Sequence, residues 1–153
     1  MIALKNILVP TDFSETSEIA VTYAKNLAEA FGATVHLLHV LQDPASYLPT
    51  EALAALPNLG QQQELAARQR LAKLLGESDA NILDVKRVVL TGTPFVDIIR
   101  YAKQHVIDLI VMGTHGRGPV KHILLGSVAE KIVRKAPCPV LTVRPPAHQF
   151  VMP

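Results

Sequence analysis

Glycine residues are concentrated in one stretch of the chain, at a spacing that favours contact with an anion. Four of the eight glycines fall in the stretch from Gly113 to Gly126. An apolar run, Asp108–Met112, precedes this stretch, and a helical pattern begins at Ser127. Glycine allows backbone N–H groups to approach a ligand, and a helix N-terminus adds unpaired donors and a partial positive charge. We therefore expect a loop that binds phosphate groups.

A second candidate for ligand chemistry, Asp12, follows the first apolar run of the chain, Asn6–Val9. In open α/β sheets, ligands bind beyond the carboxyl ends of the strands, where the strand order reverses. If the runs before Asp12 and Gly113 form neighbouring strands, the Asp12 carboxylate faces the glycine loop and can accept hydrogen bonds from ribose hydroxyls. The next predicted strand ends at His39 and Val40, which would close the site around a base.

Each of these signals has a structural alternative. Asp12 can cap the helix that follows it. Ser127 followed by Glu130 fits a capping box, which needs no ligand.

Arg117 and Lys121 lie within the loop itself, where they would meet an anionic ligand.

Two common phosphate-binding motifs are excluded by the spacing. The chain contains no G-x-x-x-x-G-K-[ST] sequence, so the loop is not a P-loop. Gly116 and Gly118 begin a G-x-G-x-x-G pattern, but Lys121 stands where the third glycine should be. The stretch also follows the fourth predicted strand, whereas the dinucleotide-binding fingerprint follows the first.

The elements that must position these residues alternate as β-α-β-α-β-α-β-α-β. The predicted strands cover residues 6–9, 34–40, 84–90, 107–112 and 137–143. The predicted helices begin after Ser14, at Gln61, at Pro94 and at Ser127, with a short helix at 51–56 inside an irregular segment. Strands rich in Val, Ile and Leu indicate burial on both faces. The fold class is therefore α/β: a single open five-stranded parallel sheet with helices on both faces.

The first helix carries an apolar stripe at helical spacing, and Gly32 is expected to end it. The stripe is broad: Ile19, Tyr23, Leu27 and Phe31 recur every four residues and are flanked by Ala20, Ala24 and Ala28. Charged residues in the third strand place that strand at an edge of the sheet.

Composition limits the class of protein. A chain of 153 residues with 49% hydrophobic residues fits one globular domain. The single cysteine, Cys138, excludes an internal disulfide, and a formal net charge of +2 does not argue for nucleic acid. No apolar run approaches the roughly 18 residues that span a bilayer, and the first residues lack a signal-peptide pattern. We expect a cytoplasmic protein with no membrane span and no nucleic-acid partner.

The glycine spacing fits a different pattern, G-x2-G-x9-G, formed by Gly113, Gly116 and Gly126 and followed directly by Ser127. This resembles the nucleotide-binding motif of the universal stress protein family. Further segments resemble that family's first strand with its acidic residue, its fourth strand and loop, its last helix and its last strand: Ile7–Asp12, Val111–Gly116, Gly126–Glu130 and Cys138–Val143. The resemblance covers nearly the whole chain and is weakest over residues 42–80.

The resemblance implies an adenine nucleotide alpha hydrolase-like sheet with strand order 3-2-1-4-5, commonly in a homodimer. It implies the ATP-binding branch of the family, because every glycine of the motif is present. The ligand would be ATP, with ADP or AMP as alternatives, and Mg²⁺ or Mn²⁺ would bridge its phosphates. No residue is predicted to be catalytic or to ligate a metal.

Carried over position by position, the resemblance assigns Asp12 to the ribose and Val40 to the adenine. The residues expected to hold phosphates are Gly113, Gly116, Gly126, Ser127 and Val128. The remaining predicted site residues shape the wall, lie near the base or ribose, or face the phosphates from the loop: Pro10, Thr11, Met112, His115 and Arg117.

Three functions fit this sequence. The first is an ATP-binding, nucleotide-dependent regulator in stress adaptation that acts on a partner protein. The second is slow ATP hydrolysis, for which His115 is the only candidate general base. The third is a nucleotide-independent module that dimerises through the predicted edge strand Pro139–Val143. We expect one domain over residues 1–146 and a mobile tail over residues 147–153.

Overall fold

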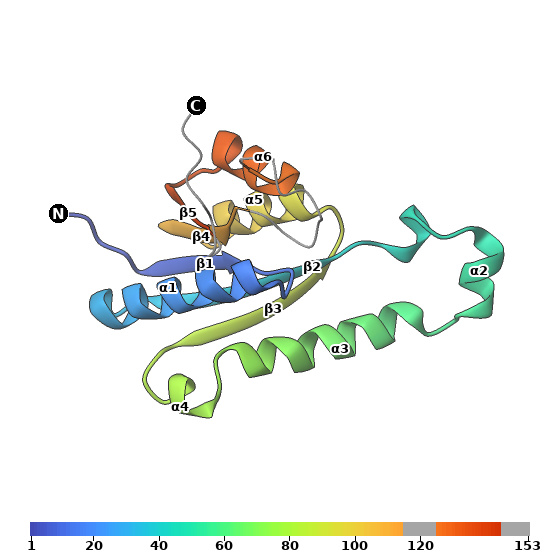
Figure 1. The fold of residues 1–153 in the computed structure, drawn as a ribbon, viewed down its shortest axis with the longest axis horizontal. Helices are drawn as coiled ribbons and strands as arrows, with labels where there is room; N and C mark the ends of the chain where they lie inside the picture. Colours follow the sequence, from blue (N-terminus) through green and yellow to red (C-terminus); the bar gives the residue numbers. More distant parts are fainter. Residues whose placement is uncertain (115–124, 145–153) are drawn as a thin grey trace.

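The computed structural model describes residues 1–114 and 125–144, and its sheet confirms the predicted α/β fold. The strands are β1 (Asn6–Pro10), β2 (Thr34–Leu41), β3 (Val85–Thr91), β4 (Leu109–Gly113) and β5 (Val140–Val143). They are parallel and lie in the order β3-β2-β1-β4-β5 (Figure 1). Ile7 of β1 pairs with Val35 of β2 on one side and with Leu109 of β4 on the other. The strand order therefore reverses between β1 and β4.

The described helices are α1 (Glu15–Phe31), α2 (Thr50–Ala55), α3 (Leu59–Leu74), α4 (Glu77–Ala80), α5 (Pro94–Gln104) and α6 (Ser127–Lys135). A 3₁₀ helix, η1, covers Pro44–Ser46. The helices α4 and η1 were not predicted, because a single turn is too short to show a helical period. The fourth strand begins later than predicted, because the Ile107 N–H donates to the Ala102 carbonyl of α5.

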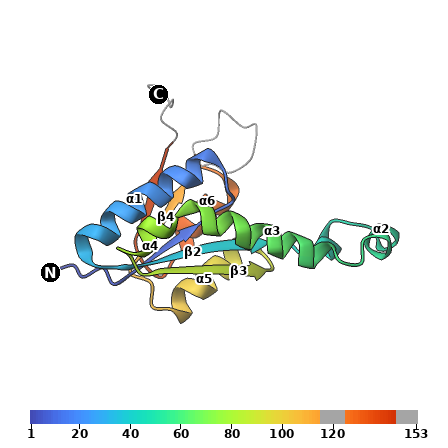
Figure 2. The ribbon, with the colours of Figure 1, turned by 90° about the horizontal axis from the view of Figure 1, so that it is seen from below.

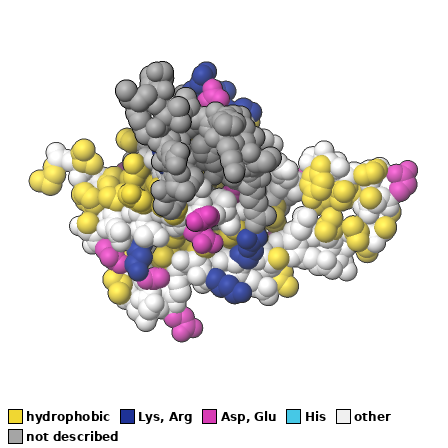
Figure 3. Space-filling view, in the orientation of Figure 1, with side chains coloured by type: hydrophobic (Ala, Val, Ile, Leu, Met, Phe, Trp, Pro, Cys, Tyr) yellow, Lys and Arg dark blue, Asp and Glu magenta, His cyan; other side chains and the backbone are white. Residues whose placement is uncertain are grey.

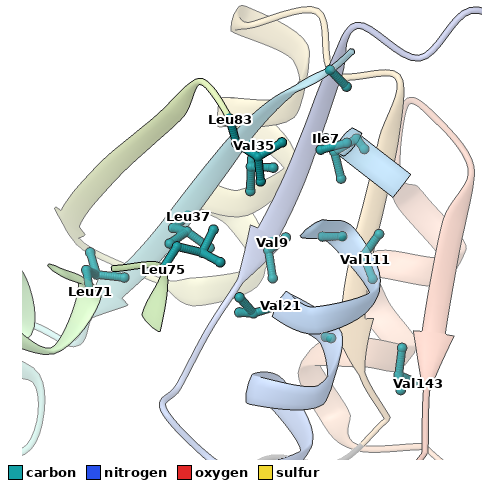
Figure 4. Packing of buried hydrophobic residues seen from close by; sticks show 14 of the residues in the cluster. Ile7, Val9, Val21, Val35, Leu37, Leu71, Leu75, Leu83, Val111 and Val143 are labelled. Atoms are coloured by element: carbon teal, nitrogen blue, oxygen red, sulfur yellow. The ribbon is translucent and has the colours of Figure 1, made fainter. Parts of the chain in front are cut away.

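The strands are buried on both faces, and their side chains alternate between two core layers. Ile7 and Val9 point toward α1 and α3, whereas Leu8 points toward α5 and α6. Figure 2 shows α1 and α3 on one side of the sheet and α5 on the other. Figure 4 shows the first layer, where Val21 of α1 and Leu75 at the end of α3 lie over the sheet. Two covered faces explain why the strands read as continuous apolar runs.

The predicted apolar stripe of α1 is wrong in part. Tyr23 and Phe31 are 52% and 51% exposed. Ile19 and Leu27 lie at the margin of the core. The residues that α1 buries are mostly small: Thr16, Ser17, Ala20, Val21, Ala24 and Ala28. Small side chains allow the helix axis to approach the sheet closely, so the larger residues of the stripe are turned toward solvent. The ends of α1 are as predicted, with Ser14 as N-cap and Gly32 in the left-handed conformation (φ 66°).

The first turn of α1 rests directly on the last residue of β4. A Cβ atom added to Gly113 would lie 2.7 Å from Cγ2 of Thr16 and 3.2 Å from its carbonyl carbon. Real Cβ atoms essentially never lie within 3.0 Å of another atom, and the contact with the backbone carbon is also tighter than most real ones. Packing alone therefore favours glycine at position 113, whatever else this residue does.

Part of the structure extends beyond the sheet. We call residues 42–66, which include α2 and the first part of α3, the arm. Helix α2 has no buried residue, and α3 buries only Ala67 and Leu71, which lie after the arm. Figures 1 and 2 show α2 and the start of α3 projecting away from the sheet. Hydrophobic side chains cover this projection (Figure 3), and Tyr47, Leu56 and Leu65 are each at least half exposed.

A histidine is fully enclosed in the layer between β2 and α5. His36 is 1% exposed; its Nδ1 lies 2.9 Å from the Tyr101 hydroxyl and its Nε2 lies 3.3 Å from Oδ1 of Asn6. The amide oxygen can only accept, so Nε2 carries the proton and Nδ1 accepts from Tyr101. The pKa of His36 is lowered to about 4, chiefly by burial; the charges of Lys86 and His105 contribute to the lowering, while that of Asp84 opposes it. The folded protein therefore holds this imidazole neutral.

We expect the stability of the protein to fall as the pH drops from 6.5 toward 4. Above pH 6.5 His36 is neutral in both states, whereas below it the unfolded chain binds a proton that the folded protein excludes. At about 1.4 kcal/mol per pKa unit, the loss reaches about 3 kcal/mol near pH 4. Urea unfolding gives the free energy of unfolding across this pH range for wild type and for His36→Gln. The difference between the two pH profiles is the contribution of His36. Parallel profiles would contradict the assignment.

We expect Gly113→Ala to destabilise the protein by about 1–3 kcal/mol, the usual cost of overpacking. The added methyl group must displace the first turn of α1 from β4. Gly60→Ala is the matched control, since a Cβ there meets nothing within 4 Å and alanine suits a helix better. Denaturant midpoints compare the two variants. Adding Thr16→Ser to Gly113→Ala should restore part of the loss, and an unchanged midpoint for Gly113→Ala would refute the packing argument.

Candidate functional site

The strand-order reversal brings two predicted site segments together. β1 ends at Pro10 and β4 ends at Gly113, and these strands are direct neighbours. Because the strands are parallel, the turn after Pro10 and the segment after Gly113 leave the same edge of the sheet. Helices α1 and α6 begin at this edge, and each brings a partial positive charge at its N-terminus. This is the position where open α/β sheets bind ligands.

The turn from β1 into α1 is held by a closed set of hydrogen bonds. The Ser17 hydroxyl donates to the Ser14 carbonyl (2.8 Å), so the Thr11 hydroxyl donates to Ser17 Oγ (3.0 Å). Oγ1 of Thr11 accepts from the Phe13 N–H (3.0 Å). Oδ1 of Asp12 accepts from the Ser14 N–H (3.0 Å). The N-cap of α1 is Ser14, so the alternative in which Asp12 caps the helix is wrong. The half-buried Asp12 carboxylate is instead fixed by an Asx-turn before the helix.

Phe13 adopts a backbone conformation that is unusual for an aromatic residue. Its φ of 63° lies in the left-handed region, and its side chain is buried. The centroid of the Phe13 ring lies 4.5 Å from the centroid of the His39 ring. It also lies 4.2 Å from the guanidinium carbon of Arg70. Nδ1 of His39 donates to the Thr11 carbonyl at 2.7 Å. Residues from β2 and α3 thus hold the Asp12 turn, and the contact of Arg70 was not predicted from the sequence.

The two ends of the glycine-rich segment are joined by backbone hydrogen bonds. The Gly126 N–H donates to the Thr114 carbonyl at 2.7 Å, and the Thr114 N–H donates to the Val143 carbonyl at 2.9 Å. The N-cap of α6 is Gly126, with Ser127 as the first helical residue and no side-chain cap. The predicted capping box is therefore wrong. The N–H of Gly126 donates within the protein, so the donors that this helix start adds are those of Ser127, Val128 and Ala129.

Three of the predicted site residues share the α5 and α6 side of the sheet. Met112 is buried in this core layer, and Val40 and Val128 are partly buried against it. Pro10 and Thr11 are buried at the end of β1. The predicted residues His115, Gly116 and Arg117, and the predicted tail, lie outside the described residues. Within the described ranges the structure therefore groups an apolar wall, a fixed carboxylate and a helix start at one edge.

The rest of the described chain adds two findings about ligand classes. Within residues 1–114 and 125–144, no three His, Cys, Asp or Glu side chains are grouped as a metal site. Over the same residues, none of the helices combines the length and apolar character needed to cross a membrane.

Comparison with known proteins agrees with the fold. The sequence profile of the universal stress protein family matches residues 3–144. Universal stress protein MJ0531 of Methanocaldococcus jannaschii is 36% identical over 147 residues, which cover 95% of this chain and 85% of that protein. The solved structure of MJ0577 from the same organism has a TM-score of 0.83 at 32% identity, covering 96% and 100% of the two chains.

A more distant structure has the same fold. It is the universal stress protein from Archaeoglobus fulgidus in complex with dAMP, which is 20% identical with a TM-score of 0.63 and covers 94% of this chain and 99% of its own. The family assignment rests on the profile match over nearly the whole length and on the sequence identity to MJ0531. This chain belongs to the universal stress protein family.

Proposed function

We propose that this protein is an ATP-binding regulator whose nucleotide occupancy controls a partner protein in stress adaptation. The observation that carries the proposal is the start of α6, whose N-cap residue Gly126 has no side chain to cap it, beside the fixed Asp12 turn where the strand order reverses. An uncapped helix start attracts an anion, and a carboxylate across the crevice suits the ribose hydroxyls. The dAMP complex of the Archaeoglobus fulgidus protein motivates an adenine nucleotide as the first ligand to test.

In this proposal each group has a separate task. Asp12 accepts hydrogen bonds from the ribose hydroxyls. Val40, Met112 and Val128 provide the apolar wall for the base and sugar. The N–H groups of Ser127 and Val128 hold phosphate oxygens, and a glycine at the N-cap leaves space for them. Bound Mg²⁺ or Mn²⁺ would reach the site through the phosphates.

The proposal concerns binding. Hydrolysis requires a general base that activates water, and the candidate base, His115, lies outside the described residues. Gly116 and Arg117 would complete the phosphate contacts from the same segment.

We also propose that the protein forms a homodimer through β5. This strand lies at the edge of the described sheet and is paired there with β4 alone. Leu141 at its centre is 37% exposed. An open apolar edge strand invites pairing with another strand, and pairing with the same strand of a second copy gives a two-fold dimer.

We expect Asp12→Asn to weaken ATP binding about tenfold, the effect of losing a charge-assisted hydrogen bond. Asparagine keeps an oxygen that accepts from the Ser14 N–H, so the turn is preserved. Asp84→Asn is the matched control, because Asp84 also accepts from a neutral donor (Thr34 Oγ1, 2.8 Å) but lies beside the amino end of the sheet. Isothermal titration calorimetry measures the affinities. The proposal fails if wild type does not bind ATP, or if the two variants lose affinity equally.

We expect Leu141→Lys to convert a dimer into a monomer, because a charge on the edge strand opposes pairing. Ile82→Lys is the control, as Ile82 is 73% exposed but lies before β3. Sedimentation equilibrium at micromolar concentration measures the mass. A monomeric wild type would exclude this interface.

A further inference from the structure

We propose that Arg70 is a positioning residue that connects the Asp12 turn to the arm (residues 42–66), so that nucleotide binding changes the order of the arm. This inference rests on the proposed function, since it takes ATP as the ligand at Asp12. It assigns a role to a contact between Arg70 and Phe13 that the proposed ligand contacts do not use.

The first step of the argument is the backbone of the Asp12 turn. The left-handed conformation of Phe13 is disfavoured for a side chain with a Cβ atom, and it persists only where its surroundings hold it. The ring is buried at the edge of the core, where it contacts His39 of β2 at 4.5 Å and Arg70 of α3 at 4.2 Å. Asp12 is the residue directly before Phe13, so the direction of its carboxylate depends on the same backbone.

The second step is the position of Arg70. It lies between Ala67 and Leu71, the residues that attach α3 to the core. Its neighbour Arg68 pairs with Glu64 of the same helix (2.7 Å). Among the described residues Arg70 has no carboxylate within ion-pair distance, and its charge lies over the Phe13 ring. Arg70 is therefore a direct link between the helix of the arm and the turn at the site.

The third step is the freedom of α3 to move. Phe13 and Arg70 lie at a groove of about 470 Å³ between α1 and α3, which also reaches Val21 and Leu74. The groove is open to solvent, so α1 and α3 do not pack against each other along it. The arm has no buried residue in α2, and the buried residues of α3 begin only at Ala67. A small change at Phe13 can thus alter how the first part of α3 is held while Ala67 and Leu71 stay in the core.

These steps give a coupling with a defined direction. ATP at Asp12 stabilises one conformation of the turn, which fixes Phe13 and, through it, Arg70 and α3. The arm then becomes more ordered, and its exposed apolar residues Tyr47, Leu56 and Leu65 are held in one arrangement. By linkage, a change that frees α3 from Phe13 must weaken ATP binding.

The experiment measures both sides of this coupling on the full chain. Hydrogen exchange with and without saturating ATP and Mg²⁺ reports the order of the arm, and calorimetry reports the ATP affinity. In wild type, ATP should slow amide exchange over residues 42–66. Arg70→Gln should abolish this slowing and weaken ATP binding about two- to fivefold, the scale of an exposed cation–π contact. Exchange of the arm without ATP should not change.

Two further variants separate positioning from a general effect on α3. Arg70→Lys keeps a cation over the ring and should recover part of the ATP-dependent slowing. Arg68→Gln removes a charge from the same helix but not from Phe13, and should behave as wild type.

The outcomes distinguish this inference from the proposed function. If wild type binds ATP but the arm exchanges equally with and without it, the coupling is wrong and nucleotide binding stands. If Arg70→Gln matches wild type in both measurements, Arg70 has no positioning role. If wild type does not bind ATP, both proposals fail.

Discussion

The architecture depends on β1 being enclosed on all sides. Ile7, Leu8 and Val9 are fully buried, and the strand is paired along both edges. At its start, the Asp108 carboxylate accepts from the N–H groups of Lys5 and Asn6, which ties β1 to the entry of β4. Helices α1 and α3 connect β1, β2 and β3 over one face of the sheet, whereas α5 and α6 connect β3, β4 and β5 over the other, so the order reverses beside β1. The candidate site lies at that reversal.

The predicted fold was correct because its signals are local and repeated. Buried strands, Ser14 at a helix start and Gly32 at a helix end can each be read from a few residues. The stripe of α1 was correct for Ala20, Ala24 and Ala28 but wrong for Tyr23 and Phe31, because hydrophobicity alone does not show which side of a broad stripe faces the sheet. How close a helix lies to a sheet is set by the opposing surface, and Gly113 is far from α1 in the sequence. Information of this kind is tertiary and has no local signal.

The sequence predicted where the candidate site lies but not which contacts each of its residues makes. The glycine spacing led to the edge of the sheet where the strand order reverses, yet a Cβ atom at Gly113 would crowd Thr16, and the N–H of Gly126 donates to Thr114. A residue pattern shows where glycine occurs, but it does not show which neighbouring residue leaves no space for a Cβ atom. The contacts on Phe13, in the turn after β1, come from His39 of β2 and Arg70 of α3. Only the folded arrangement of three segments could have revealed them.

The exposure of α2 has a consequence for how this protein can diversify. Substitutions cost folding energy mainly where they alter packing or buried hydrogen bonds, and α2 has no buried residue. Random change in this helix is therefore nearly neutral for folding, whereas change in β1 is not. Selection can act on its surface chemistry almost independently of the sheet. Gene duplicates could acquire different recognition surfaces here while inheriting an unaltered ligand crevice.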